Sequence, residues 1–152
     1  MFKKILVCLD GSDFAEQILP YAREQAVRFQ GRLILLEVVT VPTVIAPGVP
    51  GVPGPAVRTE GMLRHGQRDE RMARSYLEEQ AQPLRQAGLK VDCVTLIGTP
   101  GETIVSYAEQ NKVNLITIAT HGAGGVKRAM FGSVADFVLR HADIPILLIK
   151  PQ

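Results

Sequence analysis

The chain has 152 residues, of which 46% are hydrophobic and 21% charged, and this balance predicts one folded domain over residues 1–152 and excludes a disordered chain. The formal net charge of only +2 argues against a surface that neutralises nucleic-acid phosphates, so we expect no nucleic-acid partner. The apolar run near the N-terminus is too short for a signal peptide and no segment reaches the length of a membrane span, which predicts a cytoplasmic protein without membrane contact.

The first elements are expected to be a strand, a helix and a second strand. Ile5–Leu9 is a continuous apolar run rich in branched residues, which predicts a strand buried on both faces. Apolar positions then recur at helical spacing from Ala15 to Phe29, and Pro20 is expected to kink that helix. Arg32–Val39 predicts a second buried strand.

Residues 42–55 are dense in proline and glycine. Such a composition cannot hold a helix or a strand ladder, so we predict a mobile loop over about residues 42–60. A proline-rich docking motif is disfavoured, because no aromatic or basic anchor accompanies the stretch. The loop is expected to lead directly into the next helix.

The second helix is predicted between Met62 and Ala87, with Met72 among the residues that face the core and Gly88 just beyond its end. Val91–Ile97 predicts a third strand. Its apolar pattern is weaker than that of the first two strands, which favours a position at the edge of a sheet.

Thr99 with Pro100 and Glu102 is typical of a helix start. Leu115–Ala119 then predicts a fourth strand, and Ile144–Ile149 predicts a fifth. Between them an amphipathic pattern predicts a last helix, whose core-facing stripe is Val134, Phe137, Val138 and His141. Strands and helices therefore alternate along the whole chain. This alternation is typical of the α/β class, with a parallel sheet and right-handed crossovers.

The segment from Leu115 to Ala135 is the most informative for function. An apolar strand leads directly into Thr120-His121-Gly122, and Gly132-Ser133 opens the last helix. The carboxyl end of a strand and the amino end of a helix are where α/β folds hold anions, usually phosphates, on backbone N–H groups. Neither a P-loop nor the dinucleotide fingerprint GxGxxG is present, so a nucleotide would be held by a different loop.

Gly122 is followed by nine residues and then by Gly132-Ser133, and Ala119 lies three residues before Gly122. This spacing resembles the universal stress protein family, whose nucleotide-binding members carry G-x2-G-x9-G-[ST]; Ala119 stands where the first glycine is usual. Segments 5–12 and 142–150 are also similar to the beginning and end of that family. The resemblance extends over nearly the whole chain, apart from the proline- and glycine-rich stretch.

The resemblance implies an ATP-binding stress-response protein that acts as a nucleotide-dependent sensor or regulator, with ATP hydrolysis slow or absent. It also implies ATP and magnesium as cofactors, and a homodimer in which the C-terminal strands Ile144–Ile149 of two copies meet. For the fold we predict a single five-stranded parallel sheet in the flavodoxin-like order 3-2-1-4-5 with helices on both faces. The crevice is expected between the first and fourth strands, where the strand order switches.

In this crevice the resemblance implies that Asp10 meets the ribose, with a magnesium ion nearby, and that backbone groups of Val38 read the adenine edge. Glycine and helix amides would meet the phosphates, because the backbone can approach them closely there. No protein ligand to the metal is expected apart from Asp10. The residues expected to bind ATP are Leu9, Asp10, Val38, Ala119, His121, Gly122, Gly125, Gly132, Ser133, Val134 and Ala135.

These roles have structural alternatives. An aspartate before a glycine is common in turns, so Asp10 could serve only its own turn. Ser133 could cap the last helix, with Asp136 completing a capping box. Ala119 favours a second functional hypothesis, in which this chain binds no nucleotide and acts through protein contacts alone. Alanine suits a strand conformation there but would resist a positive φ.

A third hypothesis is a weak nucleotide hydrolase that uses Asp10 and His121. No residue stands out as able to orient an attacking water, and neither a GxSxG elbow nor a nucleophilic cysteine accompanies His121. Cys8 and Cys93 lie in separate strand-like runs and are expected to be reduced core residues. We therefore expect no catalytic residue.

Overall fold

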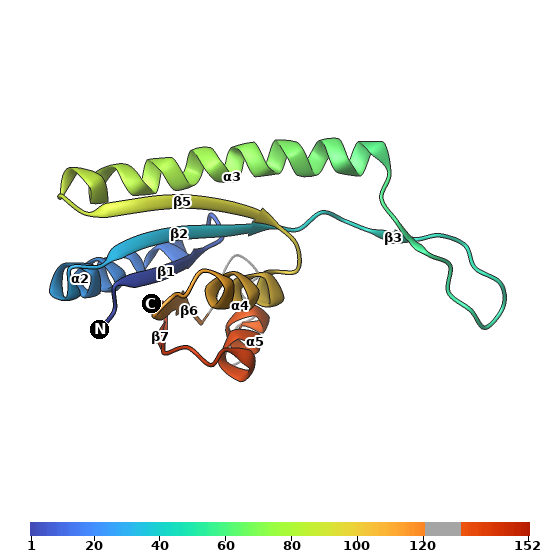
Figure 1. Ribbon diagram of the computed structural model, residues 1–152. Helices are drawn as coiled ribbons and strands as arrows, with labels where there is room; N and C mark the ends of the chain where they lie inside the picture. The colour runs from blue at the N-terminus through green and yellow to red at the C-terminus, as the bar shows by residue number, and fades with distance from the viewer. Residues whose placement is uncertain (121–131) are drawn as a thin grey trace.

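The computed structural model describes residues 1–120 and 132–152, and its centre is a parallel sheet of five strands (Figure 1). The strands stand in the order β5-β2-β1-β6-β7, which confirms the predicted α/β class and the order 3-2-1-4-5. β5 lies at an edge, as its weaker apolar pattern predicts. The strands are β1 (Lys4–Leu9), β2 (Arg32–Val39), β5 (Lys90–Ile97), β6 (Leu115–Ala119) and β7 (Ile146–Ile149).

The helices cover both faces of this sheet, as predicted. They are α1 (Asp13–Glu16), α2 (Leu19–Phe29), α3 (Glu60–Gln86), α4 (Pro100–Gln110) and α5 (Ser133–His141). Successive strand residues point to opposite faces, so Ile5, Val7 and Leu9 pack with α1, α2 and α3, whereas Leu6 and Cys8 pack with α4 and α5. Figure 1 shows α3 lying along β5, with α4 and α5 grouped on the other side of the sheet.

The first predicted helix is two helices, and Pro20 explains the break. α1 ends at Glu16 and α2 begins at Leu19, so Pro20 occupies the first turn of a new helix instead of kinking a continuous one. A proline costs little there, since its missing N–H has no acceptor within the helix. The Ser12 hydroxyl caps α1 by accepting a hydrogen bond from the Ala15 N–H (3.2 Å).

Two side chains expected in the core are exposed. Met72 is 62% exposed, and Ala73 and Leu77 face the sheet instead. His141 is also exposed, and the buried residues of α5 are Ala135 and Val138. Adjacent helix positions differ by about 100° around the axis, so a shift of one residue in the predicted stripe moves a side chain from core to solvent.

The prediction that residues 42–55 cannot form a ladder is wrong. β3 (Val44–Ile45) and β4 (Ala56–Val57) pair antiparallel, and the hairpin projects from the body of the molecule (Figure 1). At its tip the Val52 N–H donates to the Val49 carbonyl (2.9 Å), and Gly51 has φ +86°. Proline followed by a glycine at positive φ is the sequence of a type II turn, so these residues form the hairpin. Residues 44–57 are called the arm below.

The arm is expected to contribute little to stability, because none of its residues belongs to either core and Ile45 and Val49 are 67% and 68% exposed. Val44 and Val57 are cross-strand partners, so a short Gly-Ser linker can replace residues 44–57 without strain. We expect thermal denaturation of this variant to give a Tm within about 3 °C of the full chain. Leu77→Ala, in the core, is the positive control and should cost about 2–5 kcal/mol. If replacing the arm lowered the Tm as much as Leu77→Ala does, the arm would contribute to the stability of the fold, contrary to this prediction.

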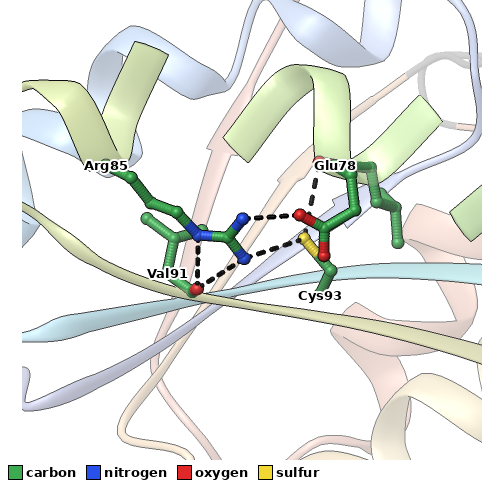
Figure 2. A network of polar contacts seen from close by, with 5 residues as sticks. Glu78, Arg85, Val91 and Cys93 are labelled. Atoms are coloured by element: carbon green, nitrogen blue, oxygen red, sulfur yellow. Dashed lines mark hydrogen bonds and ion pairs between the residues drawn. The ribbon is translucent and has the colours of Figure 1, made fainter. Parts of the chain in front are cut away.

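A polar network joins the C-terminal part of α3 to the amino-terminal half of β5 (Figure 2). Arg85 donates to the Val91 carbonyl through Nε (3.1 Å) and Nη2 (2.9 Å), and its Nη1 pairs with Glu78 Oε2 (2.5 Å). The Cys93 thiol donates to the Leu77 carbonyl (3.4 Å). These bonds lie at the opposite end of β5 from the carboxyl edge of the sheet, and they fix α3 along this edge strand.

Both cysteines are free, as the sequence predicts. Burial raises the pKa of the Cys8 thiol to about 12, and burial together with the Glu78 charge raises the pKa of Cys93 to about 11. Neither thiol forms the thiolate near neutral pH, so neither is suited to act as a nucleophile. Over residues 1–120 and 132–152, none of the helices combines the length and the apolar character that crossing a bilayer requires.

Candidate functional site

The carboxyl ends of the central strands bring several predicted site residues to one edge of the sheet. Leu9 ends β1, Val38 lies next to the end of β2, and Ala119 ends β6. β1 pairs with β2 on one side and with β6 on the other, so the strand order switches at β1. Ligands of open α/β sheets bind at such a switch point, which makes this edge the candidate site.

Asp10 follows β1 directly and is held by its own turn. Its Oδ1 accepts hydrogen bonds from the Ser12 N–H (3.0 Å) and from the Ser12 hydroxyl (2.5 Å), and Gly11 between them has φ +79°. The turn role considered from the sequence is therefore present. It also fixes the Asp10 carboxylate at the carboxyl edge, because Ser12, which donates both bonds, is the N-cap residue of α1.

Glu37 is a residue of this edge that the sequence analysis missed. It is the β2 partner of Leu9, and its Oε2 is buried without a hydrogen-bond partner. Burial, and then the charge of Asp10, raise the pKa of Glu37 to about 7. The available signal was a carboxylate within the otherwise apolar run Leu33–Val39.

The amino end of α5 is tied to the end of β6 by the backbone. Gly132 is the N-cap residue, and its N–H donates to the Thr120 carbonyl. The Thr120 N–H in turn donates to the Ile149 carbonyl (2.8 Å), which joins β6 to β7. These bonds bring the start of α5 to the carboxyl edge, and they use the Gly132 N–H within the fold.

The first turn of α5 offers three further amides, those of Ser133, Val134 and Ala135. N–H groups of a first turn have no acceptor within the helix, and the helix dipole favours an anion beside them. The alternative in which Ser133 and Asp136 form a capping box is wrong, since Gly132 is the N-cap residue and Ser133 is already the first residue of the helix. Asp136 instead accepts from Arg140 Nε (2.9 Å).

Ala119 fits its place without strain. It is the last residue of β6, it is buried, and it is absent from the residues with positive φ. The conformational objection to alanine at this position therefore does not hold for the backbone found here.

Three predicted site residues, His121, Gly122 and Gly125, lie outside the described residues, so their roles remain predictions. In the part of the chain that the structure describes, no group of three or more His, Cys, Asp or Glu side chains is arranged to hold a metal ion. The described edge combines a fixed carboxylate, a second carboxyl group and backbone amides. This set can bind a polar ligand through hydrogen bonds, and it lacks a nucleophile paired with a base.

Comparisons with known proteins agree with this architecture. The family model described as the universal stress protein family matches residues 1–150. A universal stress protein of Methanocaldococcus jannaschii, MJ0531, is 30% identical over 150 residues, which cover 99% of this chain and 83% of that protein. The solved structure of hypothetical protein MJ0577, from the same organism, is 26% identical with a TM-score of 0.83, covering 100% of this chain and 98% of the other.

Two more distant structures contain adenine nucleotides. A universal stress protein in complex with cAMP has a TM-score of 0.70 at 19% identity and covers 99% of this chain and 98% of its own. A universal stress protein family protein of Arabidopsis thaliana with AMP bound has a TM-score of 0.63 at 14% identity, covering 99% and 92%. At these identities the likeness establishes a shared fold.

Proposed function

Since the chain belongs to the universal stress protein family, we propose that it binds ATP with magnesium at the carboxyl edge of its sheet. It acts as a nucleotide-dependent regulator in the stress response, in the cytoplasm, and hydrolyses ATP slowly or not at all. The observation that carries the proposal is the Gly132–Thr120 bond, because it brings the open amides of α5 to the edge where Asp10 is fixed.

In this proposal each part of the nucleotide has a partner of suitable chemistry. The Asp10 carboxylate accepts from ribose hydroxyls, and backbone groups of Val38 read the adenine edge. The amides of Ser133, Val134 and Ala135 donate to phosphate oxygens, together with the backbone around Gly122 and Gly125. Leu9, Ala119 and His121 line the same crevice.

Magnesium suits the oxygen chemistry of this site. It prefers hard oxygen ligands and is usually held by one or two carboxylates and by substrate phosphates, and Asp10 is the carboxylate available here. When bound, the ion would offset part of the phosphate charge. The chain's own contribution is to position the nucleotide.

The relatives support adenine as the base, since AMP and cAMP are bound by two proteins of the same fold. The second candidate, a family member that acts through protein contacts without nucleotide, is favoured by Ala119 in place of the usual glycine. The unstrained backbone of Ala119 weakens that argument without removing it.

We also propose a homodimer through β7. This strand forms one edge of the described sheet, and all four of its apolar residues, Ile146 to Ile149, are only half-buried. Pairing with the same strand of a second copy would cover an edge that otherwise favours aggregation. The mass of the purified chain by light scattering tests this pairing, with Leu147→Lys as the disrupting variant.

Nucleotide binding is tested by the thermal stability of the purified chain with and without MgATP. A ligand at a hundred times its Kd adds about 2.7 kcal/mol, which corresponds to a rise in Tm of roughly 5–10 °C for a chain of this size. Gly122→Val should abolish the rise and leave the Tm of the free protein nearly unchanged, because a branched side chain blocks the phosphate approach.

GTP is the matched control ligand, and it should raise the Tm far less than ATP because the proposed contacts of Val38 read adenine. An equal rise with GTP would contradict adenine recognition. No rise with either nucleotide would favour the protein-contact candidate.

A further inference from the structure

The arm exposes apolar side chains on both of its faces and at its tip. Val44 and its cross-strand partner Val57 share one face and are both exposed, and Ile45 is exposed on the opposite face. Val49 and Val52 are exposed at the tip. Soluble proteins seldom present such a group of apolar side chains to water unless it meets a partner.

The arm is a formed hairpin, although it lies outside both cores. Next to the β3–β4 pairs, the Ala46 N–H donates to the Pro55 carbonyl (3.0 Å). A Cβ on Gly54 would collide with the Ala46 carbonyl. A Cβ on Gly48 would collide with the Val52 carbonyl, so glycine is what lets the two sides approach closely. The arm therefore presents its apolar side chains as one folded unit.

The base of the arm is joined to the body on both sides. Val41, just before the arm, is buried, and a Cβ on Gly66 of α3 would collide with its side chain. Just after the arm, Arg58 Nε donates to the Thr43 hydroxyl oxygen (3.1 Å). These contacts set the direction in which the arm leaves the body.

Charge is absent from the arm and returns at its base. Residues 38–57 contain no charged side chain, and Arg58 is the first one that follows. Arg58 is exposed and forms no ion pair with any residue of 1–120 or 132–152. An uncharged apolar tip with a cation at its base matches the order of layers in a lipid leaflet, where hydrocarbon lies beneath anionic headgroups.

The backbone of the arm also suits an apolar environment. A peptide group without a hydrogen bond is costly in hydrocarbon, because no water is available there. Four of the fourteen residues of the arm are prolines, which have no N–H to leave unpaired. Other N–H groups, among them those of Ala46 and Val52, donate within the hairpin. The cost of moving this backbone out of water is therefore reduced.

An occupant that covers the arm must contact it on more than one side. A flat protein surface, such as that of a second copy packed against the arm, would cover one face and leave the other in water. The proposed dimer would not cover the arm either, because the arm follows β2, and β1 and β6 separate β2 from β7. A lipid leaflet surrounds whatever enters it, so it covers both faces and the tip together.

We propose that the arm docks the protein on a membrane that contains anionic lipids: its apolar tip enters one leaflet, and Arg58 binds headgroups at the surface. Figure 1 shows the arm projecting beyond the body, so its tip can enter a leaflet while the sheet stays in water. The expectation of no membrane contact depends on segment lengths alone, and a hairpin that enters one leaflet needs no spanning segment. The proposal does not depend on nucleotide binding.

Docking is tested by flotation of the purified chain with vesicles of phosphatidylcholine and phosphatidylglycerol in equal parts. The natural chain should float with the vesicles, and Val49→Asp should weaken binding roughly tenfold or more, because a charge at the tip resists leaving water. Val27→Asp is the matched control, since Val27 is an exposed valine on α2, and it should bind like the natural chain. Circular dichroism should show that both variants are folded.

The variant in which a Gly-Ser linker replaces residues 44–57 should not float. If the natural chain fails to float, or if the linker variant floats as well as the natural chain does, the proposal is overturned.

The role of Arg58 is tested by its charge. Arg58→Gln should weaken binding to the mixed vesicles roughly three- to sixfold, and it should leave any binding to pure phosphatidylcholine unchanged. Arg28→Gln, at an exposed position of α2, is the control and should have no effect. Equal losses in the two variants would overturn the contact between Arg58 and the headgroups.

Insertion of the tip can be observed directly, because the chain contains no tryptophan. Val52→Trp supplies a single fluorophore, whose emission should shift to shorter wavelength with vesicles and be quenched by brominated lipid chains. Val27→Trp should show neither effect. The competing occupant is a second copy of the chain: a mass by light scattering that falls when the linker replaces the arm, without vesicle binding by the natural chain, overturns membrane docking in favour of self-association.

Discussion

Ser133→Pro is expected to weaken MgATP binding roughly ten- to a hundredfold while α5 stays folded. Ser133 is the first helical residue, where proline is favoured because its missing N–H has no acceptor in the helix. Gly132 before it has φ −67° and ψ 157°, the extended conformation that proline requires of its predecessor. The change therefore removes one proposed phosphate donor, and a hydrogen bond to a charged group contributes about 1.5–3 kcal/mol.

Ser133→Ala is the matched control, because it removes the hydroxyl and keeps the amide. By calorimetry, the Kd of Ser133→Ala for MgATP should lie close to that of the natural chain and well below that of Ser133→Pro. Circular dichroism should show an unchanged helix content in both variants. Equal affinities in the proline variant and the natural chain would mean that this amide does not meet the phosphates. The helix-end part of the proposed site would then be wrong.

Gly101→Ala is expected to destabilise the fold by about 1–3 kcal/mol, the usual cost of overpacking. Gly101 is the second residue of α4, and a Cβ there would lie 2.7 Å from Phe137 Cδ1 and 2.9 Å from Phe137 Cβ on α5. The Phe137 ring is itself stacked on His141, with centroids 4.0 Å apart. Relief of the clash requires movement of α5, so nucleotide binding should weaken as well.

Gly61→Ala provides the control for the same chemical change. Gly61 is also the second residue of its helix, α3, and a Cβ there would meet only Thr59 Oγ1 at 3.9 Å. Alanine is the better helix former, so this variant should be as stable as the natural chain or more stable by about 0.5–1 kcal/mol. Urea unfolding measures both, and equal stabilities of the two variants would argue against close packing of α4 on α5.

Most of the sheet could be predicted because its strands are apolar on both faces. The runs Ile5–Leu9 and Leu115–Ala119 contain no polar residue except Thr117, whose hydroxyl donates to the Leu6 carbonyl (2.9 Å). Strands of this kind are buried in a parallel sheet, and the alternation with helices then fixes the class. The strand order came from the family resemblance, since apolar patterns alone do not determine which strands are neighbours.

The features that sequence analysis missed depend on contacts between distant residues. Glu37 Oε2 is buried without a hydrogen-bond partner because of the residues of β5 and α3 that pack around it. The residue pattern of β2 alone does not reveal these neighbours. The bond from Gly132 to Thr120 decides which residue begins α5, and it overrides the capping pattern of Ser133 and Asp136. In the arm, the composition predicts that proline and glycine prevent regular structure, but the same residues form the tight turn that lets two short strands pair.

The arm leaves and re-enters the body at two neighbouring points, because Val44 is paired with Val57. A segment inserted between those points lengthens the loop but leaves the distance between Val44 and Val57 unchanged. The entropy cost of closing a loop increases only slowly with its length. A reporter peptide or a small protein with adjacent termini could therefore be inserted at Gly51 and carried outside the sheet. This molecule thus offers a ready attachment point for labels, away from the edge where its strands end.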